Sequence, residues 1–167
     1  MFQSFFPQPK LFFSSLALWS GILILVWYSF GKTIGESLGF DLAETETVIG
    51  LGHFITSEFL WFDTFFAFGA LAFFFVWRSR SPHEWQVWSV LGSALLIYLS
   101  YASVQVSVVI NAWYGPFYND IQTALTGDGG ITASDLYGHF LVFCTIAFPY
   151  ILFIILNRFF TAHYIFR

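Results

Sequence analysis

Long apolar runs alternate with short polar segments along this chain. The runs lie at residues 11–30, 59–77, 85–114 and 136–160. Because a membrane-spanning helix needs about 20 mostly apolar residues, each run is predicted to cross a bilayer. The pattern therefore predicts an all-α, polytopic membrane protein with four spans and no soluble domain.

The third and fourth runs carry signals of their own. Ser81 and Glu84 have the spacing of a capping box and Pro82 suits a first helical position, which favours a structural helix start over a catalytic use of His83. The third run is longer than a bilayer is thick, so its helix should tilt or project. Pro149 predicts a kink in the fourth.

The outer end of the third run, "NAWYGPFYNDIQTAL" at residues 111–125, mixes rings with polar groups. We expect Gly115 and Pro116 to end the helix where it leaves lipid. Four rings suit the headgroup region: Trp113, Tyr114, Phe117 and Tyr118. An aromatic belt does not explain a second set, Asn111, Asn119, Asp120 and Gln122. "TGDGG" then predicts a turn, and Thr132 or Ser134 can cap the next helix.

Small and polar residues of the third run share one side of the expected helix. They are Ser89, Gly92, Ser93, Ser100, Ser103, Ser107 and Asn111, whereas Gln105 points elsewhere. Such a side should face protein or water. It serves either close packing between helices or the border of a wet cavity. We expect Val106, off this side, to face lipid.

Three ionisable residues near the spans are candidates for proton coupling. Asp63 lies one turn inside the second run, either as a proton relay or as an interfacial carboxylate at a helix start. Asp135 and His139 are four residues apart and either share a proton or are both solvated. His53, His83 and His163 lack the spacing of a metal site.

Composition agrees with the membrane assignment and excludes several function classes. Charged residues make up 10% and hydrophobic residues 57%, against roughly 25% and 45–50% in soluble domains. The net charge of −4 argues against nucleic acid as a partner. Cys144 has no intrachain disulfide partner and is interpreted as a packing residue. No phosphate-binding loop or nucleophile motif is present, so we expect no cofactor, metal or catalytic residue.

Basic residues predict the orientation. Lys10, Arg78, Arg80, Arg158 and Arg167 share one side of a four-span topology, whereas Lys32 is alone among acidic residues on the other. Since Lys and Arg of short loops stay in the cytoplasm, both termini are predicted to be cytoplasmic.

Four landmarks resemble those of the SbmA/BacA family of bacterial inner-membrane peptide transporters. They are "MFQSFFPQP", "SPHEWQVWS", "NAWYGPFY" with "IQTAL", and "HYIFR". The resemblance covers the whole chain. "NAWYGPFYNDIQ" is more distantly similar to the membrane domains of ATP-driven exporters.

The resemblance implies an exporter-like helical fold and a homodimer in the inner membrane that imports antimicrobial and other peptides with the proton gradient. It marks family-motif positions at Asn111, Trp113, Tyr114, Phe117, Tyr118 and Gln122. Family members continue past the position of Arg167, so we expect this chain to be an N-terminal portion, with most coupling carboxylates beyond it. The competing functions are a non-transporting membrane scaffold and the membrane half of an ATP-driven exporter.

Overall fold

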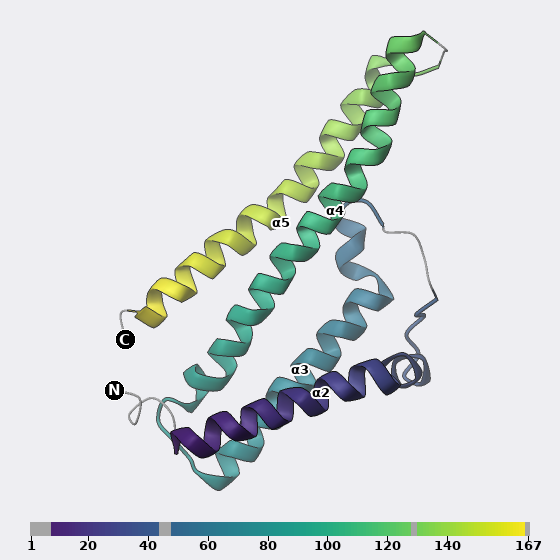
Figure 1. Ribbon diagram of the computed structural model, residues 1–167. Helices are drawn as coiled ribbons and strands as arrows, with labels where there is room; N and C mark the ends of the chain where they lie inside the picture. Colours follow the sequence, from purple (N-terminus) through teal and green to yellow (C-terminus); the bar gives the residue numbers. More distant parts are fainter. Residues whose placement is uncertain (1–7, 44–47, 128–129, 166–167) are drawn as a thin grey trace. The chain divides into compact units, whose positions relative to one another are not determined.

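The computed structural model describes residues 8–43, 48–127 and 130–165, and within them every regular element is helical (Figure 1). The elements are α2 (Pro9–Ser37), the 3₁₀ helix η1 (Leu51–Ile55), α3 (Ser57–Arg80), the π-helix η2 (Val87–Gly92), α4 (Ser93–Thr126) and α5 (Ala133–Ile165). Four helical stretches are long and apolar enough to cross a membrane. The predicted all-α architecture with four spans is confirmed at this level.

The helices are longer than the apolar runs that predicted them. The third stretch, Val87–Thr126, has 40 residues, which corresponds to about 60 Å at 1.5 Å per residue. A hydrocarbon core is about 30 Å thick, so part of this stretch must lie outside it. The apolar pattern reports only the part of a helix that suits lipid, and the hydrogen-bonded backbone continues past it.

The chain forms two compact units, which we describe separately. The first contains residues 1–44 and 57–95, and the second contains residues 45–56 and 96–167. Helices α2 and α3 belong to the first unit. The η1 segment, nearly all of α4, and α5 belong to the second.

Tryptophan side chains connect α2 and α3 in the first unit. Trp19 donates its indole N–H to the carbonyl of Gly69 on α3 at 3.0 Å. In the opposite direction, Trp61 donates to the carbonyl of Gly31 on α2, also at 3.0 Å. A Cβ at Gly35 would lie 2.9 Å from Trp61 Nε1, so the contact depends on a glycine there. Lipid offers an indole N–H no acceptor, which makes such bonds between helices valuable.

The start of the third span differs from the expected capping box. The backbone N–H of Ser81 still donates to the carbonyl of Trp77, so Ser81 completes the last turn of α3 and does not cap a new helix. His83 instead holds the turn that precedes the helix, because its Nδ1 accepts the backbone N–H of Trp85 at 3.2 Å. Gln86 follows with no exposed surface, and its amide donates to the carbonyl of Phe74. Helical geometry thus begins at Gln86 and passes directly into η2.

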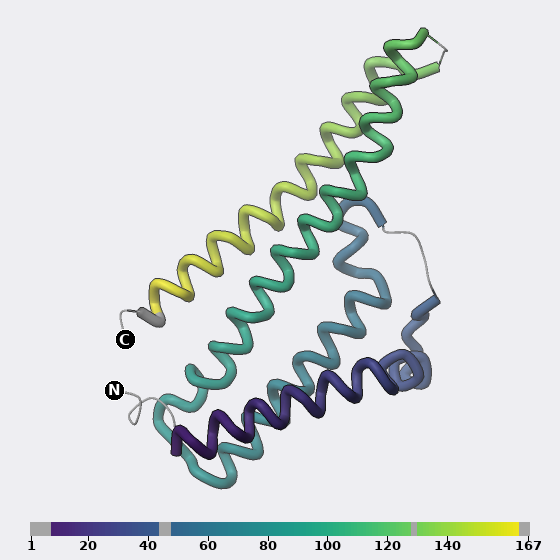
Figure 2. Tube along the Cα trace, viewed as in Figure 1, coloured from purple at the N-terminus to yellow at the C-terminus, as the bar shows by residue number. Residues whose placement is uncertain are grey.

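The expected helix end at Gly115 and Pro116 is wrong. α4 continues through both residues to Thr126, and the trace shows no break before the turn (Figure 2). Proline lacks the N–H for the carbonyl of Ala112 and costs an interior helix about 3 kcal/mol. Packing of the flanking residues Trp113 and Phe117 against α5 offsets this cost. Pro149 likewise lies inside α5 and is buried.

Candidate functional site

The second unit is built on a buried ridge of α4. Val106 and Val109 have no exposed surface, Trp113 is 5% exposed, and all three pack with Ile146 of α5. These α4 positions follow one another at intervals of three and four residues, so they form one face of the helix. The expectation that Val106 faces lipid is therefore wrong.

The η1 segment closes one side of this core. Phe54 packs against the buried cluster and contacts Phe153 of α5 with ring centroids 6.1 Å apart. Beside it, His53 Nε2 lies 3.0 Å from Gln105 Oε1 of α4. His53 and Gln105 thus have a structural role, connecting the loop before α3 to α4.

Trp113 and Phe117 form the aromatic centre of the site. Their rings stack with centroids 4.5 Å apart, and Trp113 donates its indole N–H to the carbonyl of His139 at 3.0 Å. Phe117 contacts the rings of His139 and Phe140 edge-on. These two rings therefore belong to the α4–α5 core. Only Tyr114 and Tyr118 of the expected belt are exposed, stacked on each other with centroids 5.7 Å apart.

A contact between a histidine and a carboxylate lies one turn beyond Phe117. His139 Nε2 is 2.8 Å from Asp120 Oδ2, and the two side chains are 20% and 31% exposed. The pair connects α4 to α5 and borders the Phe117 ring.

Of the two alternatives for Asp135 and His139, the structure does not show a shared proton, because Asp135 is exposed and bonds another residue. Asp135 Oδ2 instead accepts the backbone N–H and the hydroxyl of Thr132, at 2.8 and 2.7 Å. Thr132 also accepts the backbone N–H of Asp135 through its carbonyl. This is the arrangement of a capping box, in which a side chain of the first turn returns to the residue before the helix. Thr132 thus precedes the helix as predicted, but its hydroxyl donates to Asp135 and does not accept a backbone N–H of that helix; the first-turn carboxylate also suits the helix dipole.

A polar face of α4 lies opposite the buried ridge. Its members follow at intervals of three or four residues and are exposed, except for the half-buried Ser103: Ser100, Ser103, Ser107, Asn111, Tyr114, Tyr118 and Gln122. The expected polar side is thus found from Ser100 onward. Ser89 is buried in the first unit, where the wider turns of η2 interrupt the 3.6-residue period.

The two halves of this face differ in their free hydrogen-bonding groups. The hydroxyls of Ser100, Ser103 and Ser107 donate to the carbonyls of Leu96, Leu99 and Ser103, four residues earlier. Ser100 also accepts a bond from Asn157 of α5 at 3.2 Å. By contrast, no side chain or backbone group of the described residues bonds the polar atoms of four side chains: Asn111, Tyr114, Tyr118 and Gln122. These four are available to a ligand.

The remaining candidates lie elsewhere. Asp63 is half-buried in the second turn of α3, in the first unit. Among the described residues, no three of His, Cys, Asp and Glu converge as a metal site would require. The landmark at residues 1–7, the turn residues 128–129, and Arg167 lie outside the described residues.

Sequence reasoning did not pair Asp120 with His139, although a signal was present. Asp120 follows Trp113 by seven residues and Phe117 by three, so it shares their helix face. If the helix ended at Pro116, as the sequence predicts, Asp120 would lie outside it and would not share a face with Trp113. Continuing the helical period past the proline would have placed Asp120 toward α5.

A model of the SbmA/BacA-like family matches residues 82–167. The chain belongs to this family. The matched region begins just after α3 and covers η2, α4 and α5. It therefore includes the buried ridge, the Asp120–His139 pair and the polar face.

Membership in the SbmA/BacA-like family also fits the four apolar helices, and together they identify a multi-pass membrane protein. The family-motif residues expected from the resemblance divide between two roles in the structure. Trp113 and Phe117 hold α4 against α5, whereas Asn111, Tyr114, Tyr118 and Gln122 lie on the exposed face. Asp63 lies outside the matched region.

Proposed function

We propose that the chain is the N-terminal membrane portion of a proton-driven transporter that takes up peptides across the bacterial inner membrane. The observation that carries this proposal is the exposed end of the polar face, Asn111, Tyr114, Tyr118 and Gln122, on a membrane helix of the SbmA/BacA-like family. Lipid would leave these polar atoms unsatisfied, so they require water, a peptide or another protein segment.

The chemistry of this face suits peptides of varied sequence. Asn and Gln amides and Tyr hydroxyls each donate and accept hydrogen bonds, as a peptide backbone does. The stacked rings of Tyr114 and Tyr118 add apolar contact area for peptide side chains. No charged side chain belongs to the face, so it places no strong demand on peptide charge.

Protons supply the energy in this proposal. Moving one charge across 100 mV releases about 2.3 kcal/mol, enough to shift the balance between two conformations that differ by a few kcal/mol. The Asp120–His139 pair joins α4 to α5 on the side of α4 that faces α5 and is the local candidate for sensing protons. Asp63 is a second candidate, and Asp135 serves the helix cap. The sequence has no phosphate-binding loop, which argues against ATP as the direct source, and we assign no catalytic step.

The proposed assembly is a homodimer with an exporter-like arrangement of helices, surrounded by membrane lipids and using no cofactor. The long α4, which extends beyond one bilayer thickness, supports the exporter-like arrangement, and the family resemblance supports the homodimer. The basic residues Lys10, Arg78, Arg80 and Arg158 support an orientation with both termini in the cytoplasm.

Uptake into vesicles that hold the complete protein tests this function. Without nucleotide, an imposed inward proton gradient should accelerate the entry of a fluorescent antimicrobial peptide, and a protonophore should abolish the acceleration. Replacing Tyr118 and Gln122 together by Ala should reduce uptake about 30-fold, since each of the two lost hydrogen bonds to the peptide is worth about 1 kcal/mol. The matched control is Tyr137→Ala, because Tyr137 is also exposed but lies on α5.

The competing functions give different results. Uptake that ignores the gradient and requires ATP would reject proton coupling and identify an ATP-driven exporter half. No uptake under either condition, with normal membrane insertion, would reject transport and favour a scaffold. Equal uptake by the double variant and Tyr137→Ala would remove the polar face from the path.

A further inference from the structure

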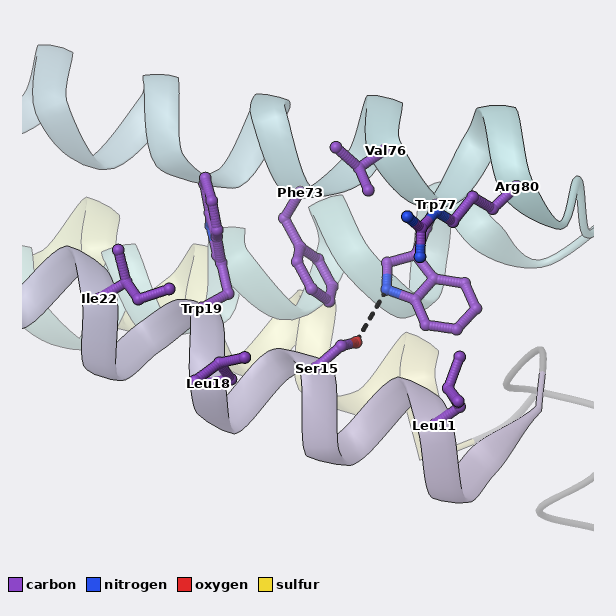
Figure 3. A pocket seen from close by; sticks show the side chains of 9 residues that line it. All are labelled: Leu11, Ser15, Leu18, Trp19, Ile22, Phe73, Val76, Trp77 and Arg80. Carbon is purple, nitrogen blue, oxygen red and sulfur yellow. Dashed lines mark hydrogen bonds between the residues drawn. The ribbon is translucent and has the colours of Figure 1, made fainter.

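A groove runs along the contact between α2 and α3 in the first unit (Figure 3). It holds about 200 Å³ and is bordered mainly by apolar side chains. These include Leu18, Trp19 and Ile22 of α2 and Phe73, Val76 and Trp77 of α3. It is separate from the polar face of α4, and the proposed function does not use it.

The groove presents almost no unsatisfied polar atoms. Trp77 donates its indole N–H to Ser15 Oγ at 3.0 Å, and the Ser15 hydroxyl donates to the carbonyl of Phe12 at 2.8 Å. The indole N–H of Trp19 is occupied by the carbonyl of Gly69. An occupant therefore gains contact with carbon atoms and needs no hydrogen-bonding groups along most of its length.

One end of the groove is charged. Arg80, the last residue of α3, borders it at the end where Leu11 and Trp77 lie. Within the described part of the chain, no carboxylate forms a salt bridge with Arg80. Arg78 lies in the same last turn, and Lys10 precedes Leu11 on α2. An occupant that combines an apolar tail with an anionic head matches this distribution of charge.

The length of the groove matches one membrane leaflet. Its α2 wall runs from Leu11 to Ile22, which is about 16 Å at 1.5 Å per residue. Half of a hydrocarbon core is about 15 Å. A chain that lies in the groove with its head at Arg80 therefore ends near the bilayer centre.

We propose that this groove binds an anionic phospholipid, with one acyl chain between α2 and α3 and the phosphate at Arg80. Arginine forms bidentate hydrogen bonds with phosphate, and the Lys10 and Arg78 charges add attraction to the anionic head. The basic ends of α2 and α3 face the leaflet that carries the negative surface potential in the proposed orientation. Neutral lipids lack the net charge that makes this end favourable.

Native mass spectrometry of the full chain, extracted from membranes of phosphatidylglycerol and phosphatidylcholine in equal amounts, tests the proposal. The protein should retain phosphatidylglycerol in preference to phosphatidylcholine. Arg80→Gln should lower this retention about fivefold, the effect of one basic residue at a membrane surface. Val76→Trp should also lower it, because the larger ring occupies the groove. Circular dichroism of each variant checks that the helices are intact.

Matched controls separate this site from general attraction to lipid. Arg158→Gln removes a basic residue of α5, and Val104→Trp adds a ring on the exposed surface of α4, so neither should change retention. An equal loss with Arg158→Gln, or no preference for phosphatidylglycerol, would overturn the proposal. A third result would also overturn the proposal: Val76→Trp disrupts a protein dimer but causes no loss of bound lipid. In that case a second copy of the chain would occupy the groove.

Discussion

At the residue scale, the partner of His139 is the main change from what the sequence predicts. Spacing along one helix left Asp135, four residues away, as one possible partner, but the structure gives that carboxylate to Thr132 and pairs His139 with Asp120 on the neighbouring helix. A helix start has backbone N–H groups without partners in the helix, and a first-turn carboxylate can satisfy one of them. Spacing along a helix identifies side chains that can pair. Backbone N–H groups at the helix start compete for the same carboxylate and can prevent that pairing.

A double-mutant cycle measures this pairing. Asp120→Asn and His139→Gln should show a coupling free energy of about 1 kcal/mol in the thermal or denaturant stability of the protein in detergent, as expected for a partly exposed ion pair. The same cycle with Asp135→Asn and His139→Gln is the control and should give coupling near zero. Coupling confined to the Asp135 cycle would contradict the structural assignment.

At the element scale, the sequence predicts which segments are helices better than where they end. Runs of Leu, Phe and Val reveal the lipid-facing part of each helix. The end of α4 depends on contacts with α5, which are distant in sequence and so invisible to local pattern. Trp113 and Phe117 resemble interfacial aromatic residues in the sequence, yet they form the contact that continues α4 past Pro116.

Removing that contact should release the end of α4. Phe117→Ala loses the stack on Trp113 and the contact with Phe140, at a cost of about 2 kcal/mol for a half-buried ring. Because Pro116 already weakens this point, amide hydrogen exchange should accelerate at residues 119–126. Tyr118→Ala is the control, since Tyr118 is exposed and its loss should leave exchange nearly unchanged. Equal protection in both variants would show that the helix end does not depend on Phe117.

At the scale of the whole molecule, composition and apolar runs sufficed for a multi-pass, all-helical protein. It was harder to predict which face of each helix is buried and which is exposed. The polar face from Ser100 to Gln122 was found only up to Asn111, because the assumed break at Pro116 stopped the count, and Val106 was assigned to lipid although it is fully buried. Helix α4 packs against protein on one side and is exposed on another. The position of α5 decides which side of α4 is buried.

Orientation also belongs to this scale. In a Cys144→Ser background, Ser37→Cys and Ser134→Cys should react with a membrane-impermeant thiol reagent from the outside of the cell, since the distribution of Lys and Arg predicts that the opposite helix ends are cytoplasmic. Ser79→Cys, at the basic end of α3, is the control and should react only after the membrane is opened. Reaction of Ser37→Cys or Ser134→Cys only after opening would reverse the proposed topology.

The indole bonds between helices have a mechanical consequence. Trp19 and Trp61 cross between α2 and α3 in opposite directions, while Trp113 fastens α4 to α5. A shift of one helix past its partner by one turn, about 5.4 Å, would break these bonds in a medium that offers no substitute acceptor. Sliding by a full turn within either pair is therefore disfavoured. If the proposed transport requires the helices to move, that motion is expected at the segments between the pairs, where no indole bond has to break.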